Sequence, residues 1–219
     1  MQFLSREAYR LSAVIALRSR HRFVCPFFSG YLVNIFTGRR MTQARGDRMR
    51  VLGLDPGYAK VGYGAIEYSS PSFKPLCFGV ISTHAKTPFE QRLMEIDVGV
   101  NKVIDEYRPD AAAIEKLFFT SNQKTAIDVA QARGVIVLSA AKKGIPVFEY
   151  TPLQVKQSVV GYGRAEKQQV MEMTRIILSL RELPKPDDAA DALAVAICHV
   201  HSASSLLGGI QSAMMKELV

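Results

Sequence analysis

A short apolar stretch, residues 51–54, ends in the acidic residue Asp55 and is followed at once by Pro56 and Gly57. Its valine and leucines favour a β-strand. Pro56 and Gly57 end that strand, because proline has no N–H to give to a strand ladder and glycine accepts the backbone angles of a turn. We therefore predict that Asp55 stands at the tip of a strand, although an aspartate in this position can also simply begin a turn.

The period of the apolar residues predicts two further strands and then alternating helices and strands. The predicted strands are 50–54, 61–68, 75–83, 111–115 and 146–149, and the predicted helices are 88–107, 123–143, 152–160, 165–180 and 187–201. Three successive strands followed by strands separated by helices predict an α/β layered fold. We expect a five-stranded mixed sheet, with three antiparallel and two parallel strands, flanked by helices.

The positive charge of the chain is unevenly placed. The net charge is +8, but residues 1–48 hold nine arginines and two acidic residues, so residues 49–219 are close to neutral. Overall basicity is therefore no argument that the folded part binds nucleic acid. We interpret residues 1–48 as a non-native or disordered basic leader, with a targeting peptide and a nucleic-acid-binding arm as alternatives. A single domain is predicted at 49–202 and a flexible tail at 203–219.

The cysteines and the apolar runs bear on the compartment. Cys25, Cys77 and Cys198 are far apart and form no Cys-x-x-Cys pair, which fits neither a zinc site nor a disulfide scaffold. Arginines interrupt the apolar runs near the N-terminus, so no stretch of 18 residues could span a membrane. A reducing cytoplasm is the expected location, and no membrane partner is expected.

Further acidic residues stand at predicted element ends. Glu115 closes the strand 111–115, and Asp188 and Asp191 lie three residues apart on the last helix, which puts them on one face. Alanines around them keep that helix thin enough to approach the strand ends. We therefore predict that Asp55 and these three acids converge. Asp187, which is rotated away from them, is interpreted as a helix cap.

Four carboxylates in one place repel one another unless a cation is present. Oxygen ligands without histidine or cysteine favour Mg²⁺, with Mn²⁺ as an alternative, over zinc. Two such ions about 3.5–4 Å apart would activate a water molecule and stabilise the leaving oxygen of a phosphodiester. The acids thus predict metal-dependent phosphodiester hydrolysis.

Six groups of short segments between residues 49 and 202 form a larger pattern. They are Gly53-Leu54-Asp55-Pro56-Gly57 with Gly62-Tyr63-Gly64, Ala113-Ile114-Glu115-Lys116-Leu117-Phe118, Ala130-Gln131-Ala132-Arg133-Gly134, residues 155–161, Ala165-Glu166-Lys167, and residues 188–194. Together they resemble the RuvC family of bacterial Holliday junction resolvases. The resemblance implies a ribonuclease H-like fold, a homodimer with two active sites, and paired symmetric nicks across four-way DNA junctions in recombination and repair. It also implies a RuvA–RuvB branch-migration complex as partner.

The resemblance implies a role for each matching side chain. Asp55, Glu115, Asp188 and Asp191 would be the catalytic metal ligands. Phe118 would stack on unpaired bases at the crossover, with core packing as the alternative. Lys156 and Lys167 would bind phosphates of the scissile strand, with a solvated helix face as the alternative.

Other functions remain open at this point. A strand that ends in aspartate and leads into a hairpin also occurs in sugar kinases and actin-like ATPases, but these need a second phosphate-binding hairpin and a second similar domain, and we find neither. A non-catalytic DNA-binding module would tolerate loss of the acids. Another ribonuclease H-like nuclease, acting on RNA–DNA hybrids or flaps, would share the metal chemistry.

Overall fold

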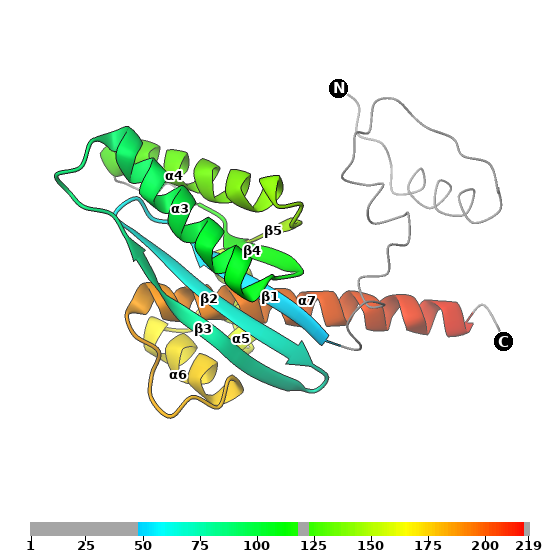
Figure 1. Cartoon of the computed structure of the whole chain (residues 1–219). Coiled ribbons are helices and arrows are strands. Elements are labelled where there is room, and N and C mark those ends of the chain that lie inside the picture. The colour runs from blue at the N-terminus through cyan, green and yellow to red at the C-terminus, as the bar shows by residue number, and fades with distance from the viewer. Residues whose placement is uncertain (1–47, 118–122, 217–219) are drawn as a thin grey trace, which may run out of the picture. The chain divides into compact units, whose positions relative to one another are not determined.

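The computed structural model describes residues 48–117 and 123–216, apart from the side chains of residues 123–125 and 205–216 (Figure 1). The strands are β1 (Arg48–Asp55), β2 (Lys60–Ser69), β3 (Ser72–Ser82), β4 (Ala111–Glu115) and β5 (Val147–Tyr150). The helices are α3 (Phe89–Tyr107), α4 (Gln123–Lys142), α5 (Pro152–Val160), α6 (Lys167–Ile177) and α7 (Asp187–Lys216). The order of elements agrees with the order predicted from the hydrophobic period.

The five strands form one mixed sheet in the order β3-β2-β1-β4-β5. β1, β2 and β3 are antiparallel neighbours, whereas β4 and β5 continue from β1 in parallel. This confirms the predicted mixture of antiparallel and parallel strands. The register places Leu54 of β1 opposite Tyr63 of β2 and opposite Ile114 of β4.

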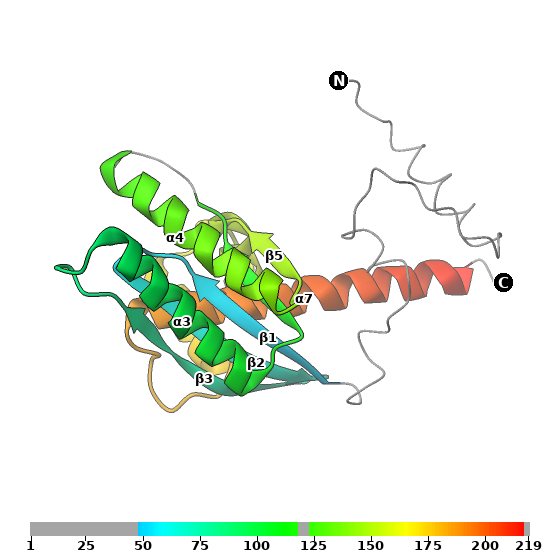
Figure 2. The same ribbon diagram turned by 45° about the horizontal axis from the view of Figure 1, so that its top comes forward.

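Helices cover both faces of the sheet (Figure 2). α3 and α4 lie on one face, over a core that includes Leu52, Ile96, Ile114 and Ile136. α7 lies across the other face, with α5 and α6 packed against it, over a core that includes Val51, Val155 and Leu193. Because successive side chains of a strand point to opposite faces, odd positions of β1 and β4 face α7 and even positions face α3 and α4.

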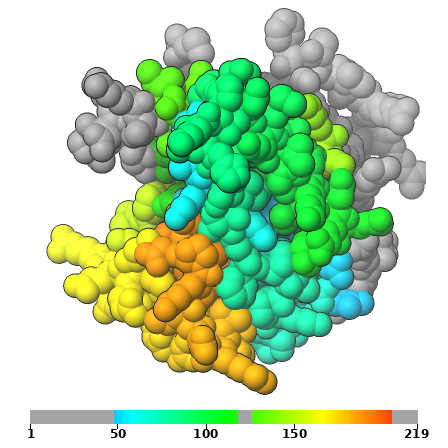
Figure 3. All heavy atoms as spheres, turned by 60° about the vertical axis from the view of Figure 1, so that its left-hand side comes forward, coloured from blue at the N-terminus to red at the C-terminus, as the bar shows by residue number. Residues whose placement is uncertain are grey.

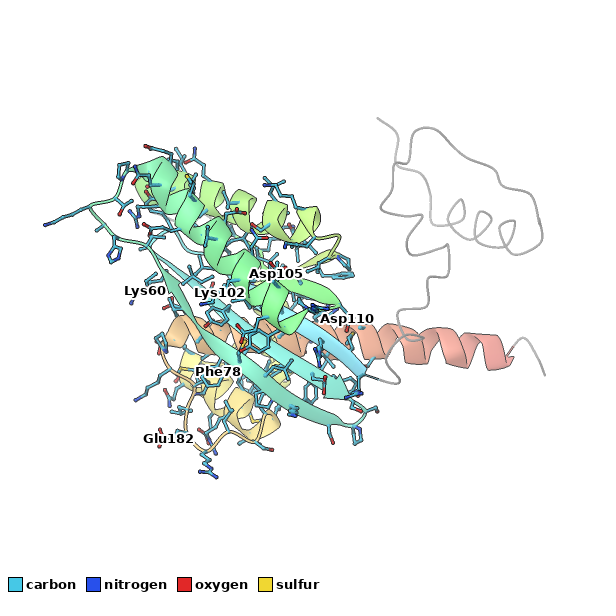
Figure 4. The ribbon with its side chains drawn as sticks, viewed as in Figure 1. Lys60, Phe78, Lys102, Asp105, Asp110 and Glu182 are labelled. Atoms are coloured by element: carbon cyan, nitrogen blue, oxygen red, sulfur yellow. The ribbon has the colours of Figure 1, made fainter. Side chains whose placement is uncertain are left out.

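Polar contacts join α3 to α4. The Lys143 ammonium group, just past the end of α4, lies 2.7 Å from a carboxylate oxygen of Asp105, which lies on α3 (Figure 4). Closer to the sheet, the buried Ser139 hydroxyl donates to the Asp97 carboxylate at 2.6 Å. The two helices therefore form a single layer.

The last helix is longer than predicted. We expected it to end at His201, but α7 continues to Lys216. Ser202 at the end of the apolar run suggested a stop; its hydroxyl instead donates to the carbonyl of Cys198 one turn earlier, inside the helix. Leucine, alanine, methionine and lysine, which are strong helix formers, make up half of residues 203–216 and outweigh the two glycines there.

The predicted leader lies outside the described residues, except for Arg48, which begins β1. Among the helices that the structure describes, none is both long enough and apolar enough to cross a bilayer.

Candidate active site

Two neighbouring strands end in acids. Asp55 is the last residue of β1 and Glu115 the last residue of β4, and the parallel register pairs the residues directly before them, Leu54 and Ile114. Both acids occupy odd positions, so they face α7 together with Val51 and Ala113. The structure thus brings the two predicted strand-tip acids side by side on one face.

α7 begins directly over these strand ends. A Cβ added to Gly53 would overlap the carbonyl oxygen of Ala192, and one added to Gly62 would overlap the carbonyl oxygen of Asp188. Gly62 is the strand partner of Asp55, so the first turn of α7 rests on the same rung of the sheet as the acid. Fully buried alanines on the helix complete this close contact. The thin helix predicted from the alanines is therefore what carries Asp188 and Asp191 to the strand ends.

Figure 3 turns this end of the sheet toward the viewer. The start of α7, drawn in orange, lies side by side with the segment of α5 and α6, drawn in yellow. The acids thus stand where three parts of the chain meet: the tips of the central strands, the first turns of α7, and the α5–α6 segment.

The electrostatics of the acids reflect their crowding. Burial, followed by the charges of Glu115, Asp191 and Asp188, raises the pKa of Asp55 to about 7. Burial and the Asp191 charge raise the pKa of Glu115, and burial raises that of Asp191. The charges of the other three predicted acids therefore all act on Asp55, and the metal-free site holds less negative charge at neutral pH than four carboxylates would carry.

Two lysines lie beside the acids. The Lys167 ammonium nitrogen, at the start of α6, is 3.1 Å from Asp191 Oδ2 and 3.2 Å from Asp187 Oδ2. Lys156, on α5, is close enough for its charge to work against the raised pKa of Glu115. Both predicted lysines are thus at the site. The structure gives Lys167 partners that the sequence did not indicate, and it places Asp187 in an ion pair with this lysine.

The donor set fits a hard divalent cation. Its members are carboxylates, and burial and nearby acids raise the pKa values of Asp55, Glu115 and Asp191, a cost that a positive charge removes. Within the part of the chain that the structure describes, no three carboxylate, histidine or cysteine side chains are already close enough to hold an ion. In this metal-free arrangement Lys167 supplies the neighbouring positive charge. Phe118 lies outside the described residues.

Comparison with known proteins identifies the family. The family model described as "Crossover junction endodeoxyribonuclease RuvC" matches residues 51–199, which include all four acids. The chain belongs to the RuvC family. A RuvC from Caldanaerobacter subterraneus subsp. tengcongensis is 54% identical over 158 residues, covering 72% of this chain and 96% of that protein. A RuvC from Alkaliphilus metalliredigens is 56% identical over 154 residues, covering 70% and 94%.

Solved structures of Holliday junction resolvases agree with the fold. The structure of Thermus thermophilus RuvC in complex with a Holliday junction substrate matches with a TM-score of 0.68 and 37% identity, covering 71% of this chain and 94% of that one. The yeast mitochondrial Holliday junction resolvase Ydc2 matches with a TM-score of 0.57 at 14% identity, which supports the fold alone. The fold is thus the ribonuclease H-like fold of the RuvC family, as the sequence resemblance implied.

Proposed function

We propose that this chain is a structure-selective endodeoxyribonuclease that resolves four-way DNA junctions by paired symmetric nicks in recombination and repair. The observation that carries the proposal is the meeting of Asp55, Glu115, Asp188 and Asp191, from two strands and one helix, at one end of the sheet in a RuvC-family domain. The related Thermus protein has been captured with a Holliday junction substrate, which supports the choice of substrate.

The four acids are proposed to hold Mg²⁺, two ions in each site, with Mn²⁺ as an alternative. When bound, the metal would supply an activated water and charge stabilisation for the leaving oxygen. Asp55 lies on the central strand, its pKa is raised by the charges of the other three acids, and it is proposed as the ligand that both ions would share. Lys167, which lies beside Asp187 and Asp191, is proposed to contact a phosphate of the scissile strand, and Lys156 and Phe118 are further proposed DNA contacts.

We also propose that the chain acts as a homodimer, because two symmetric nicks require two sites. Exposed apolar side chains on the α3–α4 layer offer a surface for the second copy: Met94 and Val98, one turn apart on α3, are 65% and 66% exposed, and Leu138 on α4 is 52% exposed. A RuvA–RuvB complex as branch-migration partner and a cytoplasmic location are proposed from family membership.

The test compares the full chain with its Asp55→Asn variant. Each is incubated with Mg²⁺ and an end-labelled four-way junction, a linear duplex of the same arms or an RNA–DNA hybrid, and the products are mapped on a sequencing gel. We expect symmetric nicks in the junction alone, reduced at least about 100-fold by Asp55→Asn while junction binding is retained. Binding without nicks by the unaltered chain would favour a non-catalytic module, and cutting of the hybrid would favour another ribonuclease H-like activity.

A further inference from the structure

A nearly buried arginine lies beside the turn that follows Asp55. Arg92 projects from the first turns of α3 and is 8% exposed. None of the ion pairs among the described residues includes it. A buried cation without a carboxylate partner is costly unless other groups take over its solvation. Its contacts therefore show what holds it in place.

The contacts of Arg92 converge on residues 56–59, the turn between β1 and β2. Its guanidinium carbon lies 3.7 Å from the centre of the Tyr58 ring, and its Nε donates to the Thr83 hydroxyl at 2.9 Å. Thr83 is itself bonded to the turn: its hydroxyl donates to the carbonyl of Tyr58 at 2.9 Å, and its amide donates to the carbonyl of Ala59 at 3.0 Å. Arg92 and Thr83 thus form a relay between α3, the end of β3 and this turn.

A second side chain of α3 contacts the turn as well. The ring of Phe89, at the start of α3, lies 5.4 Å from the Tyr58 ring, so Tyr58 contacts both an aromatic ring and a guanidinium group of α3. Inside the turn, Gly57 leaves no room for a side chain, because an added Cβ would overlap the carbonyl oxygen of Lys60. Only Pro56 and Gly57 separate the clamped Tyr58 from Asp55.

We propose that Arg92 is a positioning residue for Asp55: through the Thr83 hydroxyl and the Tyr58 ring it fixes the turn that aims the Asp55 carboxylate at the acid cluster. The inference deepens the proposed function and rests on it. A planar guanidinium suits both tasks at once, since it stacks on a ring while its Nε donates in the plane, which a lysine ammonium group cannot do. The role is geometric, and Arg92 touches no reacting group.

The test uses Thr83, because it sits in the middle of the relay and its replacement disturbs packing less than removal of Arg92. Thr83→Val removes the hydroxyl at nearly constant shape, and Thr83→Ser keeps the hydroxyl. Arg92→Lys keeps the charge without the planar fork. Gln91→Leu, at an exposed neighbouring position on α3, is the matched control. Each full-length variant is measured for single-turnover junction nicking in Mg²⁺, for junction affinity without metal, and for the hydrogen-exchange protection of the amide of residue 83, which donates to the carbonyl of Ala59.

We expect Thr83→Val and Arg92→Lys to nick at least about 10-fold more slowly, with junction affinity changed less than about 2-fold, because small misplacements of a reacting group are costly. Exchange of the residue-83 amide should be faster in both, whereas Thr83→Ser and Gln91→Leu should match the unaltered chain. Slow nicking by Thr83→Ser, or faster exchange without slower nicking, would overturn the positioning role. If the unaltered chain nicks no junction, the proposed function fails. Unchanged exchange in Thr83→Val would separately show that the Thr83 hydroxyl does not hold the turn at residues 56–59 in place.

Discussion

The ammonium nitrogen of Lys167 lies 3.1 Å from a carboxylate oxygen of Asp191, so the acid cluster has a counter-ion of its own from α6. This single positive charge does not compensate the whole cluster, because burial and three neighbouring acids still raise the pKa of Asp55 to about 7. The metal-free protein therefore carries electrostatic strain that depends on pH and that a divalent cation would relieve.

Removing the Asp55 charge should stabilise the metal-free protein. From an ordinary value of 3.8, the Asp55 pKa rises to about 7 on folding, so between these pH values the folded protein keeps a proton that the unfolded chain has lost. The free energy of unfolding should therefore fall as pH rises through this window and level off above it. In EDTA at pH 8, urea titrations should give Asp55→Asn a free energy of unfolding about 2 kcal/mol higher than that of the unaltered chain. Mg²⁺ should stabilise the unaltered chain and not the variant; an equal effect on both would contradict this account.

Glycine at positions 53 and 62 should be essential for docking of α7. Gly53→Ala or Gly62→Ala would push a methyl group into the backbone of the helix and should lower the free energy of unfolding by about 3 kcal/mol. Gly134→Ala is the matched control, because a Cβ there, on α4, meets nothing within 4 Å. This control should be neutral or stabilising by up to about 1 kcal/mol through its helix propensity. Chemical denaturation of the three variants would check the contrast.

Charge on the α3–α4 surface should separate the proposed dimer. Val98→Glu places a carboxylate on an apolar side chain that is 66% exposed, and burying it between two copies would leave it without a partner. Sedimentation equilibrium should show a dissociation constant at least about 10-fold weaker for this variant. Ile176→Glu, at a similarly exposed apolar position on α6 in the opposite layer, should leave the dimer intact. A monomeric unaltered chain, or equal weakening by both variants, would argue against this surface.

His199 should make the fold sensitive to acid. This buried side chain accepts from or donates to the Tyr150 hydroxyl through Nδ1 at 2.7 Å, and burial lowers the His199 pKa from 6.5 to about 4. Between these pH values His199 is protonated in the unfolded chain but not in the folded protein. The free energy of unfolding should therefore fall as pH drops from 6.5 to 4. His199→Phe should flatten this slope.

The acid-sensitivity measurement is best made in the Asp55→Asn background, because Asp55 produces a slope of the opposite sign over part of the same range. At pH 8, His199→Phe should cost about 1 kcal/mol for the lost contact with Tyr150. An unchanged slope between pH 6.5 and pH 4 would show that another group controls the acid limb.

The strand-tip acids were predictable because the information is local. An apolar run that ends at Asp55 before Pro56-Gly57, and another that ends at Glu115, indicate both the strand and the position of its acid. The start of α7 was equally clear from its alanines and acids. The end of α7 was not predictable in this way. A serine favours the end of a helix when its side chain hydrogen-bonds to backbone groups in a non-helical conformation. The Ser202 hydroxyl instead donates to the carbonyl of Cys198 within the helix, so the helix continues.

Contacts between distant segments were beyond local patterns. The ion pairs of Lys167 with Asp187 and Asp191 join α6 to α7 across a loop whose path the hydrophobic period does not specify. The hydrophobic pattern assigns Arg92 no separate role, because one charged residue within an apolar helical stripe does not change the prediction of a helix. Its position among apolar neighbours was the available signal, since arginine is rarely buried without a specific set of contacts.

The acids of the site come from opposite ends of the folded domain, with Asp55 on its first strand and Asp188 and Asp191 on its last helix. During synthesis, the strands that carry Asp55 and Glu115 leave the ribosome well before the helix that carries the other two acids. A growing chain therefore has half of the carboxylates until α7 has been made and has docked over Gly53 and Gly62. The contact of α7 with Gly53 and Gly62 therefore ties assembly of the site to completion of the domain, since all four acids lie together only after this helix has docked.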